Sequence, residues 1–291
     1  MALAIGLLAA ALAIFAPGYF ARENLVDIFL ANLPVLVIAL GMTLIVILGH
    51  IDISVGSIFA MCGVAAGLAA KAGWPMPLVL VAACALGAAL GGINGALVAY
   101  VGLPSIVVTL ATMVALRDAL RWSTQGAWVQ DLPAGFQWLG VGQDGYPFVA
   151  AVVALGLFAA VAWSMRHLRL GRAIFATGSN PEAARLAGLH GASLTCALFA
   201  AAGALTGLAA LLNSVRFNQI PTNAGLGLEM KVIAAVIVGG AAIRGGRATF
   251  VGTLLGVVLL GIIGPALTFL GVNAYWERAV QGGIILAGLL R

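Results

Sequence analysis

The chain has 291 residues, of which 63% are hydrophobic and only 8% are charged. A typical soluble domain carries about 25% charged residues, so this composition excludes a soluble globular fold. The high hydrophobic content also excludes disorder, and the 14 basic residues form no continuous stripe, which excludes nucleic-acid binding. We therefore expect an all-α, multi-pass helix bundle that sits in the lipid bilayer as one transmembrane domain, residues 1–291.

Apolar runs divide the chain into about ten predicted spans, because a spanning helix needs about 20 apolar residues. These are residues 2–20, 25–49, 55–70, 77–100, 105–122, 147–165, 193–213, 228–243, 248–270 and 275–290. No basic residue precedes the first run, so it is predicted to be a span and not a cleaved signal. The eighth run contains two charged residues and ends in Gly-Gly, so we expect a broken or half-buried element there.

The connection over residues 166–192 is the most basic segment of the chain. It carries Arg166, Arg169, Arg172 and Arg185, opposed only by Glu182. Basic loops favour the cytoplasmic side of a membrane, so this connection is predicted to be cytoplasmic. Ten alternating spans then place both termini in the cytoplasm.

Within this connection, residues 178–188 predict a helix of about two turns. Asn180 is a good N-cap, Pro181 suits the first helical position and Glu182 complements the positive end of the helix dipole. Gly188 suits the left-handed position after the helix. The outward face would present Ala183, Leu186 and Ala187, with Arg185 at its side. The pattern leaves two roles open, a helix resting on the protein's own rim or a docking site for a soluble partner.

Several segments, in chain order, resemble the permeases of ATP-binding-cassette (ABC) importers of the ribose/branched-chain type. They are residues 51–57 (IDISVGS), 94–95 (NG), 104–110 (PSIVVTL), 178–188 with its Glu-Ala-Ala and Gly, 227–235 (GLEMKVIAA) and 239–247. Within this family, Gly227–Lys231 and the stretch Trp128…Leu132-Pro133-Ala134 look most similar to the autoinducer-2 and rhamnose permeases.

The resemblance implies a sugar importer core in the bacterial inner membrane, without an enzymatic activity of its own. Two permeases, identical copies or sister chains, would form the pore, and a periplasmic sugar-binding protein would deliver the solute. Cytoplasmic ABC ATPase subunits would bind the ATP and dock on the 178–188 helix. The coupling residues would be Asn180, Pro181, Glu182, Ala183, Ala184, Arg185 and Gly188.

Polar residues in apolar surroundings mark candidate positions on the substrate path. Asp52 and Ser54 separate the second and third spans, where they either cap the third span or line the inner mouth of the pore. Asn94 lies in the fourth span and Thr109 in the fifth, where each either bonds a neighbouring helix or contacts the sugar.

Glu229 and Lys231 open the eighth span, near its predicted outer end. Two residues apart on a helix, they do not face each other, so each needs another partner or water. They either anchor the helix at the interface or sit where the sugar enters.

No catalytic or metal site is predicted. His50, His167 and His190 lack ligand spacing, and Cys62, Cys84 and Cys196 lie singly within apolar runs. The alternative function is a secondary transporter or channel that works without an ATPase. That class favours ionisable residues near mid-membrane in two matching halves, a pattern that this sequence lacks.

Overall fold

A computed structural model describes residues 1–273, 276, 279, 282 and 283. Its helices are α1 (Ala2–Phe15), η1 (Pro17–Phe20), α2 (Arg22–Ile47), α3 (Val55–Lys71), α4 (Met76–Ala99), α5 (Ser105–Thr124), η2 (Gln137–Gly140), α6 (Gly142–His167), α7 (Arg169–Ser179), α8 (Pro181–Leu186), α9 (Gly191–Ser214), α10 (Leu228–Val238) and α11 (Phe250–Phe269). Over the described ranges the only pairing of β type is one isolated bridge, so the expected all-α class is confirmed there.

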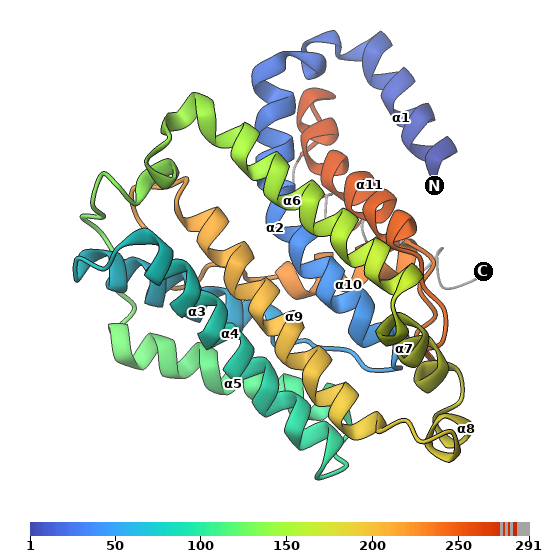
Figure 1. Cartoon of the computed structure of the whole chain (residues 1–291). Helices are drawn as coiled ribbons and strands as arrows, with labels where there is room; N and C mark the ends of the chain where they lie inside the picture. Colours follow the sequence, from blue (N-terminus) through green and yellow to red (C-terminus); the bar gives the residue numbers. More distant parts are fainter. Residues whose placement is uncertain (274–275, 277–278, 280–281, 284–291) are drawn as a thin grey trace.

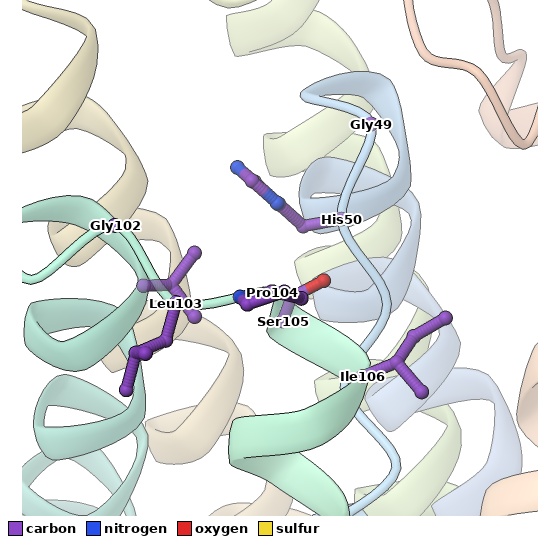
Figure 2. A pocket seen from close by; sticks show the side chains of 8 residues that line it. Gly49, His50, Gly102, Leu103, Pro104, Ser105 and Ile106 are labelled. Atoms are coloured by element: carbon purple, nitrogen blue, oxygen red, sulfur yellow. The ribbon is translucent and has the colours of Figure 1, made fainter.

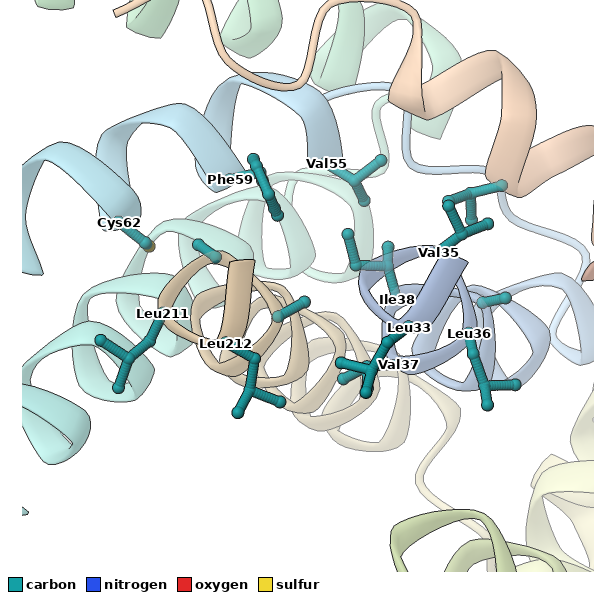
Figure 3. Packing of buried hydrophobic residues seen from close by; sticks show 14 of the residues in the cluster. Leu33, Val35, Leu36, Val37, Ile38, Val55, Phe59, Cys62, Leu211 and Leu212 are labelled. Carbon is teal, nitrogen blue, oxygen red and sulfur yellow. The ribbon is translucent and has the colours of Figure 1, made fainter. Parts of the chain in front are cut away.

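The core of the bundle is built around α2 and α9, which pack against each other (Figure 1). From Leu33 to Ile47 every residue of α2 is buried, on all faces of the helix. A helix that is apolar all round is typical of the centre of a large bundle. Figure 3 shows Leu33 to Ile38 of α2 beside Leu211 and Leu212 of α9, with Phe59 and Cys62 of α3 nearby.

Glycines bring α4 and α9 unusually close. A Cβ added to Gly87 of α4 would overlap the carbonyl oxygen of Gly203 in α9, and the reverse also holds. A Cβ added to Gly91 of α4 or to Gly207 of α9 would likewise overlap the backbone of the other helix. The Gly spacing of four in the sequence therefore marks this crossing, as expected for membrane helices.

Two helices, α3 and α10, begin inside the bundle. The 11 residues of α10 rise about 16 Å, roughly half of a hydrocarbon core of about 30 Å. Its C-terminal end packs on the beginning of α11, where Gly239 meets Gly252. Its N-terminal end meets the first turn of α3, where the carbonyl oxygen of Gly225 lies 2.5 Å from a Cβ added to Gly56. The expected broken element at 228–243 is therefore a half-length helix that ends at Val238.

The expected number of ten spans is not confirmed. Five described helices are long and apolar enough to cross a membrane: α2, α4, α6, α9 and α11. The apolar helices α1 and α3 are shorter, because an irregular residue before η1 ends α1 at Phe15 and α3 begins only at Val55. The predicted tenth span, 275–290, lies almost wholly outside the described residues. Exposed large apolar side chains cover the outward faces of several helices, which suits contact with lipid.

Candidate functional site

The short helix α8 has the caps that the sequence predicts. The Oδ1 atom of Asn180 accepts a hydrogen bond from the backbone N–H of Ala183 at 3.0 Å, and Pro181 opens the helix. Gly188 has φ +82°, a left-handed conformation that side chains other than glycine rarely adopt. Both ends of a six-residue helix are thus fixed by local chemistry, which a helix this short requires.

One face of α8 is free and the opposite face is anchored. Ala183, Leu186 and Ala187 are exposed, as predicted, with Leu186 at 77% exposure, whereas Ala184 is buried. An exposed ion pair of 3.3 Å joins Arg185 to Glu182 one turn earlier. A small apolar surface with a charged edge therefore projects from this end of the bundle.

The helix that precedes α8 rests directly on the ends of other elements. Gly178, near the end of α7, lies so close to the carbonyl oxygen of Ile47 at the end of α2 that an added Cβ would overlap it. The backbone N–H of Gly246 donates to the same oxygen at 2.8 Å. The end of α7, the end of α2 and the α10–α11 turn thus meet at one point, directly before α8.

A buried hydrogen-bond chain links the connection before α3 to α4 and α5. Asp52 Oδ1 accepts from the backbone N–H of Ser54 at 2.8 Å and from its hydroxyl at 2.6 Å. The Ser54 hydroxyl accepts from Asn94 Nδ2 at 2.9 Å, and Asn94 Oδ1 accepts from the Thr112 hydroxyl at 2.6 Å. Asp52, Ser54 and Asn94 are fully buried, so in this structure the chain joins helices and faces no open cavity.

The first turns of α5 hold the same connection from its other side. The backbone N–H of Ile53 donates to the Thr109 hydroxyl at 3.1 Å, and that of Ile51 donates to Ser105 Oγ at 3.3 Å. Side chains therefore satisfy backbone groups that an extended segment inside a bundle would otherwise leave unpaired. Asp52 and Ser54 were the two candidates to cap α3. The Asp52 carboxylate accepts from the backbone N–H of Ser54 at the start of α3, whereas the Ser54 side chain makes no cap bond.

Glu229 is partly buried in the first turn of α10. Its Oε1 accepts from the backbone N–H of Gly227 at 3.2 Å, and its Oε2 is buried against Gly56 of α3. The two roles expected for Glu229, an interfacial anchor or a group where the sugar enters, stay predictions. Lys231 lies two residues further along α10 and is half-buried. Nearby, Arg117 Nη1 of α5 donates to the carbonyl oxygen of Ala224 at 2.8 Å.

The family model described as "Branched-chain amino acid transport system / permease component" matches residues 24–289. The chain belongs to this permease family. It is 34% identical over 294 aligned residues to the autoinducer 2 import system permease protein LsrC of Escherichia coli, covering 98% of this chain and 84% of the relative. The corresponding protein of Photorhabdus luminescens is 32% identical over 278 residues, which cover 94% of this chain and 82% of the relative. That of Salmonella paratyphi B is 33% identical over 277 residues, which cover 94% of this chain and 78% of the relative. No solved structure matches the chain.

Two features of this permease were missed from the sequence. Arg117 interrupts an apolar span, and a charge within a span is itself a signal of a buried polar contact. The helix α7 was read as part of a basic loop, although its apolar residues Ile174 and Phe175 pack against the cluster formed by α2 and α6. Its two arginines, Arg169 and Arg172, hid this amphipathic pattern.

The permease also has a hollow of about 400 Å³ between the α2–α3 and α4–α5 connections. Figure 2 shows His50 projecting from the first connection beside Leu103 and Pro104 of the second and Ser105 at the start of α5. Burial lowers the pKa of His50, so at neutral pH its imidazole is uncharged and can both donate and accept. Since Gly49 lies against the backbone of Arg244, the hollow opens at the same end of the bundle as α8.

Proposed function

We propose that this chain is the membrane-spanning permease subunit of an ABC importer for a sugar or sugar-like solute. In this proposal two permeases, a second copy or a sister chain, form the pore in the bacterial inner membrane. A periplasmic binding protein delivers the solute, and cytoplasmic ATPase subunits bind and hydrolyse ATP. The chain itself holds no cofactor, and both of its termini are cytoplasmic.

The observation that carries the proposal is the free face of α8. A helix of six residues is not stable alone in water, yet both of its ends are capped and its apolar face is left exposed. Exposed apolar residues with a charged edge are typical of a surface that a soluble partner covers. The basic residues around α8 favour the cytoplasmic side, where an ATPase would be found.

The contacts of α8 suggest how ATP hydrolysis would act on the pore. Movement of the docked ATPase would push α8, and Gly178 would pass the movement to the end of α2 and to the α10–α11 turn. α10 leads from there to the first turn of α3, where Glu229 meets Gly56. The hydrogen-bonded connection 51–54 would keep α3, α4 and α5 moving as one body.

The relatives suggest the class of solute. The LsrC proteins named above are permeases of autoinducer 2 import systems, and the alignments with those of Escherichia coli and Photorhabdus luminescens cover 84% and 82% of the relative's length. We infer that this chain acts on a comparable small polyhydroxylated solute.

The test is uptake of sugars by cells that carry the whole system, with one substitution in α8 and one directly after it. Glu182→Lys reverses the charge at the positive end of the helix, and Gly188→Trp places a bulky side chain at φ +82°. Both variants should reach the membrane folded and lose most ATP-driven uptake. Gly156→Ala is the control, because an added Cβ there meets nothing within 4 Å. Unchanged uptake in both α8 variants would contradict the docking role, and uptake without any ATPase would favour a secondary transporter or channel.

A further inference from the structure

A second hollow, of about 210 Å³, lies at the end of α9 farthest from α8. It is lined by Trp128, Phe217 and three amide side chains, Asn213, Asn218 and Gln219. The 24 residues of α9 rise about 36 Å, and α8 adjoins the other end of α9 (Figure 1). We call this hollow the amide pocket. With α8 in the cytoplasm, the amide pocket faces the outside of the cell.

Backbone pairing between two distant loops fixes the walls of the amide pocket. Val129 and Ile220 exchange hydrogen bonds, with N···O distances of 3.0 and 2.9 Å. The Thr222 hydroxyl adds a bond of 3.4 Å to the carbonyl oxygen of Gly126. These bonds hold Trp128 against the segment that follows α9, so the pocket is preformed from residues about 90 positions apart.

The amide side chains of the amide pocket are available for hydrogen bonding to a ligand. Within the described part of the chain, the side chains of Asn213, Asn218 and Gln219 make no hydrogen bond, and none of the residues lining the pocket is ionisable. An amide offers one oxygen acceptor and two N–H donors, which together match neighbouring hydroxyl groups that both donate and accept.

The aromatic residues supply the apolar part of the same site. Trp128 and Phe217 are each 46% exposed, and the Arg216 guanidinium lies 5.5 Å from the Phe217 ring centroid, which helps to hold that ring. Aromatic faces bind flat apolar surfaces such as the C–H face of a sugar ring. The pocket lining itself has no charged residue, and the nearby Arg216 guanidinium lies over the Phe217 ring, so the ammonium group of a zwitterionic amino acid would lose its hydration without a carboxylate partner.

We propose that the amide pocket is an outer subsite for an uncharged polyhydroxylated solute of monosaccharide size. The size follows from the volume, which lies below the roughly 300–1,000 Å³ typical of pockets for drug-sized ligands. The inference rests on the proposed import function and adds an outer binding site to it, whose uncharged lining favours sugars over the branched-chain amino acids in the family description.

The experiment uses the whole permease in lipid nanodiscs, with D-ribose, L-rhamnose and L-leucine as probes in saturation-transfer NMR. This method detects weak binding without the partner subunits. We expect saturation transfer to at least one sugar and none to leucine. Trp128→Leu should reduce the sugar signal roughly five- to tenfold, and Asn218→Ala should reduce it as well.

Trp122→Leu is the matched control, because Trp122 is 85% exposed on α5 and does not line the amide pocket. Trp128→Phe should keep most of the signal, since an aromatic face remains, and this separates lost binding from lost folding. Absence of sugar binding in the unmodified protein, an undiminished signal in Trp128→Leu, or leucine binding that depends on Trp128 would each overturn the assignment.

Uptake by cells with the whole system separates this inference from the proposed function. If the unmodified system imports a sugar with ATP and Trp128→Leu leaves its KM unchanged, the subsite is wrong and the importer stands. If the unmodified system imports no sugar, the proposed function itself fails. A KM raised roughly five- to tenfold in Trp128→Leu supports both.

Discussion

The hydrogen bond between Asn94 and Thr112 makes a direct test of the buried polar chain. Asn94 is fully buried and bonds both the Ser54 and the Thr112 hydroxyls, at 2.9 and 2.6 Å. Interhelical hydrogen bonds in membrane bundles contribute about 0.6 kcal/mol on average and up to about 1.7 kcal/mol. We therefore expect Thr112→Val to lower the free energy of unfolding by about 0.6–1.7 kcal/mol, and Asn94→Ala, which removes both bonds, by about 1–3 kcal/mol.

A double-mutant cycle isolates the bond from the cavity that Asn94→Ala leaves. The double variant should be less destabilised than the sum of the single ones, by about 0.6–1.7 kcal/mol. The measurement is reversible unfolding in mixed micelles, followed by circular dichroism. Thr268→Val is the control partner, because its hydroxyl bonds only Gly264 of its own helix. The destabilisation by Asn94→Ala and that by Thr268→Val should simply add in the double variant. If the destabilisations by Asn94→Ala and Thr112→Val also simply added, the interhelical bond would be refuted.

Three further substitutions test the contacts that position the candidate sites. Gly203→Val should destabilise the α4–α9 crossing by about 1–3 kcal/mol, since its Cβ would overlap the carbonyl oxygen of Gly87, and thermal unfolding in detergent measures the loss. Gly92→Ala on α4, whose Cβ would lie 3.6 Å from the nearest atom, should be near neutral, and equal stability of the two variants would contradict the close crossing. Asn180→Ala should cost α8 about 0.5–2 kcal/mol of local stability and lower ATP-driven uptake several-fold. Asn180→Asp keeps a capping oxygen and should preserve uptake, so an equal loss in both variants would argue against the cap. Gly178→Ala should uncouple uptake from ATP hydrolysis by displacing α7 from the end of α2, measured as solute transported per ATP; an unchanged ratio would exclude this contact as the path of force.

Local sequence signals predicted the parts of the fold that depend on neighbouring residues. The caps of α8 follow from Asn180, Pro181 and Gly188, which act within one turn of the chain. Glycines four residues apart, such as Gly87 and Gly91 of α4, mark a helix face that a neighbour can approach closely, as α9 does. Both patterns depend on residues within one or two helical turns of each other, so they can be recognised in the sequence alone.

Features that depend on how distant segments meet could not be predicted in the same way. The contact between Glu229 and Gly56 joins two segments about 170 residues apart, and an apolar run does not show which distant helix it meets. The bond partners of Asn94 lie 40 residues before it and 18 after it, and no local pattern selects them. The amide pocket likewise exists only because Val129 pairs with Ile220.

The central claim is that α8 docks on an ATPase, and site-specific photo-crosslinking in the native host tests it most directly. A photoreactive amino acid replaces Leu186, which is 77% exposed on α8, or Trp122, which is exposed on α5. Mass spectrometry then identifies the cross-linked proteins. The account predicts a P-loop ATPase adduct from position 186 and none from position 122. No ATPase adduct from position 186, in cells where the system imports its solute, would contradict it.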